Sequence, residues 1–209
     1  MSLTKIASRA FADQEALFLQ EMRASKSRYG FEKAALTLSE WNGRSHEEMR
    51  SHGLRVVSDY VRLSFNDAYE ALDWLYKEQE RLAIWCSCAC ARKLLPFAAK
   101  DDSVSLATIE TTEGWVLGKT NKDQVRIASR KSYDLAIQVN MLEADVPMAA
   151  SYASASGFAA NVTITVAAAL SIKLESDYDA ELRRLIEVIA DAVLTFPLKT
   201  KKLASSSRG

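Results

Sequence analysis

The chain lacks an excess of either charge, and this absence narrows the classes of function open to it. Among its 209 residues, 27 are basic and 27 are acidic. A neutral chain has no long-range field that would draw in nucleic acid or an anionic membrane, although a local charged patch can still exist. The sequence therefore disfavours a non-specific DNA-binding protein, and we expect neither a nucleic acid nor a membrane as a partner.

Cysteine and histidine are also scarce. Cys86, Cys88 and Cys90 lie within five residues, and an odd number at this spacing excludes a disulfide framework. On a helix Cys86 and Cys90 share a face while Cys88 points nearly opposite, so a metal ion would need ligands from elsewhere. The only two histidines, His46 and His52, do not share one helix face. We expect reduced cysteines that act as small buried hydrophobes, and no metal or cofactor.

An export signal and an interdomain linker are missing as well. Lys5 and Arg9 interrupt the first residues, where a secretory signal needs an unbroken apolar stretch. The length suits one substantial core better than two small ones. We expect a cytoplasmic protein with a single helical domain over residues 1–198 and a disordered basic, serine-containing tail over residues 199–209.

Charge is absent from one long internal stretch. Residues 146–172 contain no Asp, Glu, Lys or Arg, but they are rich in alanine and in hydroxyl side chains. A membrane-spanning helix needs about 20 predominantly apolar residues, and the polar content of this stretch is too high for one. Small side chains let helix backbones approach closely. The stretch therefore predicts a close-packed central helix within a bundle.

The rest of the sequence has apolar residues at the period of an α-helix. The clearest stripe lies in the last helix, which Pro197 ends, and charged residues occupy its other face. Only residues 162–166 mimic a strand, through alternation and β-branching. The stripe consists of Leu182, Leu185, Ile186, Ile189, Ala190 and Val193, opposite Glu181, Arg183, Arg184, Glu187 and Asp191.

Caps and breaks predict the other helices. Ser45 and Glu48 form a capping-box pattern that opens a helix, and the longest helix runs from residue 66 or 67 to about 95, where Pro96 ends it. Further helices cover residues 103–117 and 122–139, and two precede residue 43. The inward residues of the helix after Ser45 are Met49, Val56, Val57, Tyr60 and Val61. The prediction is an all-α, compact multi-helix bundle of about eight helices, with the alanine- and serine-rich helix at its centre.

Residues 114–120, Gly-Trp-Val-Leu-Gly-Lys-Thr, end like a phosphate-binding loop. That loop needs four residues between its glycines, so that backbone N–H groups converge on the nucleotide, but three bulky residues separate Gly114 from Gly118. We therefore interpret Gly118 as the left-handed cap of a helix C-terminus.

The sequence lacks the motifs that accompany a catalytic nucleophile and its base. His46 or His52 could reach Cys88 in space, but no glycine elbow or oxyanion loop surrounds it. Glu110 and Glu113 share a helix face, where such carboxylates are usually solvated. We assign no catalytic, cofactor-binding or metal-binding residue. Of the large aromatic residues we expect Trp74, Tyr76, Trp85 and Trp115 in the core, and Trp41 exposed.

A resemblance to a known family rests on residues 82–97, L-A-I-W-C-S-C-A-C-A-R-K-L-L-P-F, and on Ile109, Glu110, Trp115, Gly118, Arg126 and Ala128. These residues resemble the family numbered five among the immunity proteins of bacterial polymorphic toxin systems. That family is all-helical and alanine-rich, and the similarity covers residues 82–172. Where its members carry histidines among the C-terminal alanines, this chain has Tyr133, Asn140, Tyr152 and Asn161.

The resemblance implies a non-enzymatic protein that neutralises a cognate toxin by stoichiometric binding, through a few buried anchors inside a polar rim. The sequence does not mark the partner-binding face. A helical adaptor or structural subunit of a larger bacterial assembly, such as a defence system, is the alternative. An enzyme is the third hypothesis, and it would need a pocket that gathers Glu110, Glu113 or the histidines. A homodimer is compatible with all three.

Overall fold

The computed structural model describes residues 46–99, 102–139, 143–155 and 157–197, without the side chains of 46–50 and 52, together with Ile6, Ser8, Arg9, Ala12 and Asp13. These residues form an all-α fold of eight helices with no strand among them, which confirms the predicted class. The helices are α3 (His46–Ser64), α4 (Ala68–Glu78), α5 (Glu80–Arg92), α6 (Ser103–Leu117), α7 (Lys122–Ala136), α8 (Asp145–Ser154), α9 (Asn161–Lys173) and α10 (Tyr178–Leu194), with a 3-10 turn at Leu95–Phe97.

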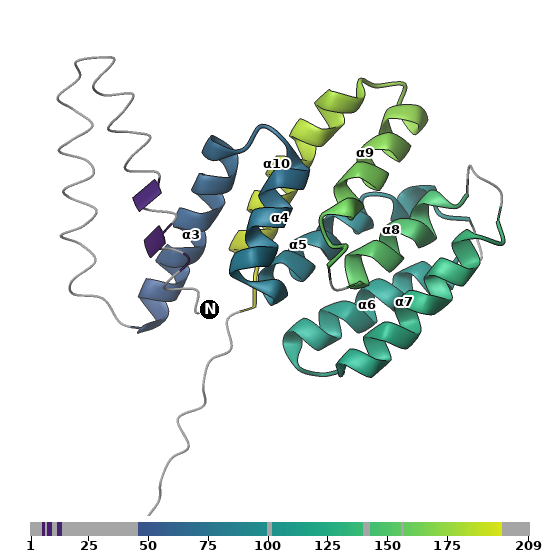
Figure 1. Ribbon diagram of the computed structural model, residues 1–209, viewed down its shortest axis with the longest axis horizontal. Helices are drawn as coiled ribbons and strands as arrows, with labels where there is room; N and C mark the ends of the chain where they lie inside the picture. Colours follow the sequence, from purple (N-terminus) through teal and green to yellow (C-terminus); the bar gives the residue numbers. More distant parts are fainter. Residues whose placement is uncertain are drawn as a thin grey trace, which may run out of the picture.

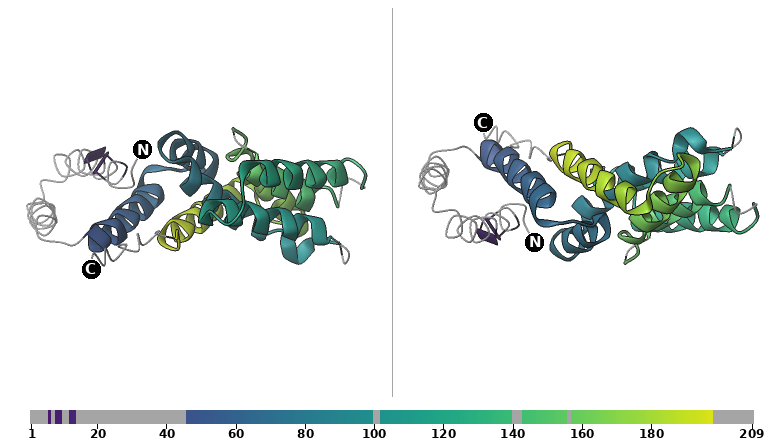
Figure 2. Two further views of the ribbon diagram at one scale, coloured as in Figure 1. Left: turned by 90° about the horizontal axis from the view of Figure 1, so that it is seen from below. Right: turned by 90° about the horizontal axis from the view of Figure 1, so that it is seen from above.

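Helix α5 lies at the centre of the bundle, where it contacts α4, α6, α8, α9 and α10 (Figure 1). Helix α3 lies at one end, against α10, and the α6–α7 pair lies at the other end (Figure 2). Because neighbours surround α5, residues on both of its sides are buried, including Leu82, Ile84 and Ala91. The core therefore continues through the bundle from α10 to α8.

The uncharged stretch forms two helices, so the prediction of a single central helix was wrong. Helix α8 ends at Ser154, Ala155 is extended, and Gly157 has a φ of 88°. An alanine Cβ is disfavoured at such an angle, whereas glycine adopts it without strain. The predicted close packing is confirmed, because both helices bury alanines: Ala149, Ala150, Ala153, Ala160, Ala167 and Ala169.

Hydroxyl groups join α8 to α6 and α7. The Oγ atoms of Thr112 and Ser154 are 2.7 Å apart, and the Ser129 hydroxyl donates to the carbonyl oxygen of Ser151 at 3.1 Å. Buried hydroxyls must find partners, and these contacts supply them across the helix interfaces. The polar content of the uncharged stretch thus serves helix packing. Among the described residues no helix is long and apolar enough to span a bilayer.

The predicted longest helix was also wrong, because a break at Gln79 divides it into α4 and α5. Gln79 is extended, with a φ of −153° and a ψ of 93°. The predicted start at residue 66 or 67 is confirmed, because Asp67 caps α4 by accepting from the backbone N–H of Tyr69 at 2.6 Å. Neither glycine nor proline marks the break, so the sequence has no local signal for it. Helix α3, with 19 residues, is the longest described helix.

Most of the remaining predictions are confirmed. Helix α6 has the predicted bounds, α7 ends at Ala136 instead of Val139, and residues 162–166 are helical.

The predicted position of Glu181 was wrong. We placed it on the polar face of the last helix, but it is buried, where it accepts from Ser176 Oγ and Arg184 Nη1. The predicted inward residues of α3 and α10 are buried: Val56, Val57, Tyr60, Val61, Leu182, Leu185, Ile186, Ile189, Ala190 and Val193. Several predictions lie outside the described residues: the side chains of Met49 and of both histidines, Trp41, most of the two helices before residue 43, and the tail over 199–209.

Candidate protein-binding surface

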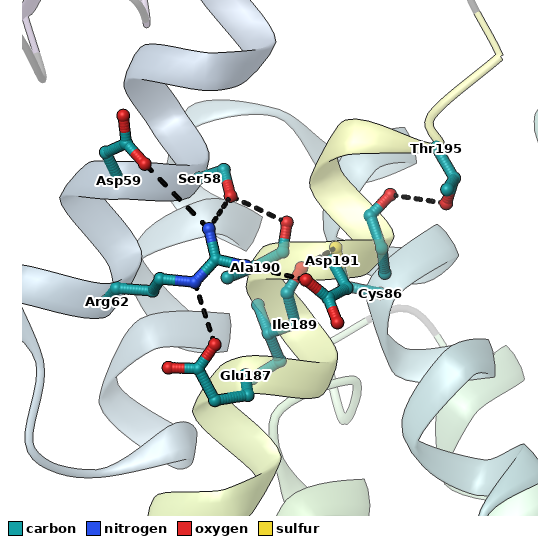
Figure 3. Close-up of polar contacts among 10 residues, drawn as sticks. Ser58, Asp59, Arg62, Cys86, Glu187, Ile189, Ala190, Asp191 and Thr195 are labelled. Carbon is teal, nitrogen blue, oxygen red and sulfur yellow. Dashed lines mark hydrogen bonds and ion pairs between the residues drawn. The ribbon is translucent and has the colours of Figure 1, made fainter.

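The three cysteines are buried, and their burial favours the neutral thiol. Cys86, Cys88 and Cys90 have no exposed surface, and Cys86 Sγ donates to the carbonyl oxygen of Ile189 at 3.7 Å (Figure 3). Burial raises the pKa of Cys86 and of Cys88 well above the ordinary value, and that of Cys90 to about 12. Neutral thiols are poor nucleophiles and poor metal ligands. The prediction that these cysteines serve as small hydrophobes is confirmed.

Glu110 and Glu113 do not converge on a common site. Glu110 is exposed, whereas Glu113 binds the guanidinium of Arg92 through both carboxylate oxygens, each at 2.8 Å. Only 20% of the Glu113 side chain is exposed. The expectation of two solvated carboxylates was therefore right for Glu110 and wrong for Glu113, which joins α6 to the end of α5.

The turn at Gly118 caps the C-terminus of α6. Gly118 is in the left-handed conformation, with a φ of 76°, as predicted. The backbone N–H of Gly118 donates to Trp115, and that of Lys119 donates to Gly114 at 2.7 Å. A phosphate cradle needs converging, unoccupied N–H groups, but these groups already satisfy the end of α6. The geometry is that of a helix terminus.

The described tryptophans lie at the edge of the core. Trp74, Trp85 and Trp115 are partly buried and pack against it, as does Tyr76, so their predicted core location is confirmed only in part. Trp85 Nε1 donates to the carbonyl oxygen of Ala192 at 3.1 Å. The ring of Trp115 contacts Arg81 and Lys122, whose cationic groups lie 5.1 and 5.3 Å from it. These aromatic residues hold helices together.

A polar network around Arg62 joins α3 to α10 (Figure 3). The guanidinium donates to Glu187 at 2.8 Å, to Asp191 at 2.6 Å and to Ser58 Oγ at 2.8 Å. The Ser58 hydroxyl in turn donates to the carbonyl oxygen of Ala190 at 2.9 Å. The charged groups of this network thus find their partners within the chain. The network therefore stabilises the contact between two helices.

The outward side of α7 has a different composition, since it exposes large apolar side chains beside cations. Ile127 and Ile137 are 54% and 62% exposed, and Tyr133 is 39% exposed. A hollow of about 490 Å³ is lined by Arg126, Ile127, Arg130 and Lys131. We call these six residues the α7 surface: Arg126, Ile127, Arg130, Lys131, Tyr133 and Ile137.

Cations outnumber acids on this side of α7. Asp123 lies 3.6 Å from Arg126, and Asp134 lies 2.9 Å from Arg130, while Lys131 adds a further positive charge. The guanidinium of Arg130 also lies 5.8 Å from the ring centre of Tyr133. The α7 surface is therefore locally basic in a chain that has no net charge.

The amino-acid pattern of α7 already marks this surface, although we did not predict it from the sequence. Val125 faces the core and is 7% exposed. Ile127 follows two positions later, which on a helix points to nearly the opposite side. An amphipathic helix normally carries polar residues on its solvent side. Isoleucine and tyrosine there depart from that pattern, and the departure can be recognised from the sequence alone.

Comparisons with known proteins do not place the chain in a family. No family model, curated protein or solved structure matches it. A function must therefore be inferred from the surfaces and buried groups of the chain itself.

Proposed function

We propose that this chain is a non-enzymatic bacterial protein that acts in the cytoplasm by stoichiometric binding to a protein, as an immunity protein that neutralises a cognate toxin. The observation that carries the proposal is the α7 surface. This surface favours a binding function over turnover. The sequence-based hypothesis of an immunity family, which covers residues 82–172 and so includes α7, is the reason for naming a toxin as the partner.

The composition of the α7 surface is that of a protein interface. Interfaces are enriched in tyrosine and arginine, and their energetic anchors are large side chains that become fully desolvated inside a polar rim. Ile127, Tyr133 and Ile137 supply such anchors, and Arg126, Arg130 and Lys131 supply the rim. Apolar anchors would gain little from a phosphate backbone, so a folded protein partner fits better than a nucleic acid.

The charge of the α7 surface indicates which charges the partner surface should carry. Arg126 and Arg130 lie near Asp123 and Asp134 of the same helix, so the surplus charge that a partner must match is that of Lys131. The partner surface should therefore carry at least one carboxylate beside an apolar centre. Association should weaken as salt is raised, since screening acts on exposed charges.

The buried groups support binding over catalysis. The thiols of Cys86, Cys88 and Cys90 have raised pKa values, and Glu113 is held by Arg92. The thiols act in packing and stay neutral at neutral pH, and Glu113 acts in the contact between α5 and α6.

A helical adaptor in a larger bacterial assembly is the second proposal, because α9 offers another exposed apolar face. Ile164 and Ile172 on α9 are 43% and 67% exposed. An adaptor needs at least two faces, one for each neighbour, whereas an inhibitor needs one.

The test is affinity purification of the tagged chain from its native cells, followed by expression of each co-eluting protein alone. A parallel purification uses the triple variant R126E/R130E/K131E. A matched control, R55E/K119E/R183E, makes the same change in net charge at exposed positions on other elements.

Immunity predicts one stoichiometric partner that kills cells when expressed alone. The wild-type chain and the control should rescue those cells, and the α7 variant should not. Several non-toxic subunits that co-elute in constant ratio would favour the adaptor. Retention of the toxin by the α7 variant would contradict the assignment of the surface, and a wild-type chain that elutes alone would contradict both proposals.

A further inference from the structure

Helix α9 presents an outward face without charge. It consists of Asn161, Ile164, Thr165, Ala168, Ser171 and Ile172, which we call the α9 face. The opposite side of the helix, with Val162, Val166 and Ala169, is buried in the core. Two further exposed apolar residues flank α9 in sequence: Phe158, 53% exposed and stacked on Tyr152, precedes the helix, and Leu174, 51% exposed, follows it.

The hydroxyl groups on this face are already satisfied within the helix. Thr165 Oγ1 donates to the carbonyl oxygen of Asn161 at 3.3 Å, and Ser171 Oγ donates to that of Ala168 at 2.8 Å. A polar group that has its partner can be buried at little free-energy loss, whereas an unpaired one cannot. The α9 face can therefore be covered by an apolar surface without leaving these donors unpaired.

The neutrality of the face restricts what can cover it. A charged surface would lose hydration on contact and find no counter-charge. This excludes the α7 surface of another copy, which carries Arg126, Arg130 and Lys131, and the outer side of α10, where Arg183, Glu187 and Asp191 are exposed. The α9 face of a second copy is neutral and apolar, and its hydroxyl donors are satisfied in the same way.

The spacing along α9 is also self-complementary. Ile164, Ala168 and Ile172 are four residues apart, so they lie in one row along the helix, with the small residue between the two large ones. A two-fold axis at Ala168 would place each Ile164 beside Ile172 of the second copy, and the alanines would let the backbones approach. We propose that two copies of this chain dimerise by antiparallel packing of their α9 faces, centred on Ala168.

The size of the face sets the strength of the dimer. A helix of 13 residues is about 20 Å long, and one face of it buries less than the roughly 800 Å² per partner of a standard stable interface. The dimer is therefore weak and concentration-dependent. It uses a different surface from the proposed toxin contact and does not depend on that function.

Sedimentation velocity of the full chain across a concentration series tests the proposal. We expect a monomer–dimer equilibrium that persists in high salt, because the contact is apolar. Ala168→Glu should shift the equilibrium to monomer at least tenfold, whereas the matched control Ala107→Glu, at an exposed alanine of α6, should leave it unchanged. Circular dichroism checks that both variants keep their helix content. A wild-type chain that stays monomeric at millimolar concentration, or a dimer that survives Ala168→Glu, would overturn the proposal.

Cysteine cross-linking tests the geometry without a charged substitution. The only three native cysteines are buried, so an introduced surface thiol is the reactive one. With a mild oxidant, Ala168→Cys should form a covalent dimer, and Ala107→Cys should not. A mixture of Ile164→Cys and Ile172→Cys chains should cross-link faster than either variant alone. Cross-linking of Ala168→Cys no faster than Ala107→Cys would rule out the two-fold contact, and so would a captured heterologous protein that cross-links to Ala168→Cys in place of a second copy.

Discussion

Arg92 and Glu113 form a two-pronged ion pair that joins the last residue of α5 to α6. Arg92 Nε donates to Oε1 of Glu113, and Nη2 donates to Oε2, both at 2.8 Å. The hydrogen bond with Glu113 is the main reason that the pKa of Arg92 is raised above its ordinary value. The two side chains are 39% and 20% exposed, so solvent screens the pair only in part. Their contact ties the C-terminal end of α5 to α6.

Glu113→Gln should lower the free energy of unfolding by about 1 kcal/mol, because it removes the charge and turns one acceptor into a donor facing the guanidinium. Urea denaturation measures the loss. Glu110→Gln, one turn away and exposed, is the matched control and should change stability by less than about 0.5 kcal/mol. Equal effects of the two substitutions would contradict the ion pair.

Ser58→Ala should destabilise the chain more than Arg62→Met, although both residues belong to the same network. The Ser58 hydroxyl is buried and donates to Ala190, so its loss should lower the free energy of unfolding by about 1–2 kcal/mol. Glu187 and Asp191 are 62% and 71% exposed, so breaking the Arg62 pairs should lower it by about 0.5–1 kcal/mol. Thermal unfolding in low and high salt distinguishes the two, because only the Arg62 effect should shrink as salt rises.

Gly118→Ala should destabilise the end of α6 by about 1 kcal/mol, since Gly118 has a φ of 76° and an alanine Cβ is strained there. Asparagine tolerates the left-handed region better. Gly118→Asn should therefore lose less than half as much, as measured by the midpoint of chemical unfolding. If alanine were tolerated as well as asparagine, the left-handed cap would be refuted.

Stability should fall at alkaline pH because the buried thiols resist ionisation. The pKa of Cys90 is raised from 9.0 to about 12. Below pH 9 both states keep the proton and this thiol does not make stability depend on pH. Above pH 9 the unfolded chain loses the proton while the native chain retains it, so the unfolded state is favoured increasingly until about pH 12.

The measurement is urea unfolding under reducing conditions at about pH 8 and about pH 10 for the wild type and for Cys90→Ala. Over this range the wild type should lose about 1.4 kcal/mol more than the variant, which lacks one buried thiol. The cavity left by the substitution affects both pH values equally and cancels. Parallel pH profiles would show that Cys90 ionises normally in the native state.

Residues close in sequence determined most helix boundaries. The Asp67 cap of α4, the Gly118 cap of α6 and the apolar stripe of α10 all depend on contacts within one or two turns. Hydrogen bonds at helix ends and the 3.6-residue period act locally, so they could be predicted without knowledge of the fold. The burial of the three cysteines followed from their small apolar character.

Tertiary contacts decided the helix break and the environments of two glutamates, which local sequence signals did not predict. The break at Gln79 carries no glycine or proline, and it lets α5 enter the centre of the bundle while α4 stays at its edge. Glu113 was taken for a solvated carboxylate because Arg92, its partner, is 21 residues away. Glu181 is similarly buried against expectation.

The α9 face became visible only from the packing, whereas the sequence pattern of α7 already marked the isoleucine and tyrosine on its outward side. The sequence determined that this chain is a helical bundle with an uncharged alanine-rich stretch, because helix period and composition are properties of each segment alone. The fold decides which side of α7 and of α9 stays exposed, because each helix can bury only the side that faces the other described helices. Exposure is a property of the assembled molecule, and so the tertiary structure alone placed Ile164 and Ile172 at the surface.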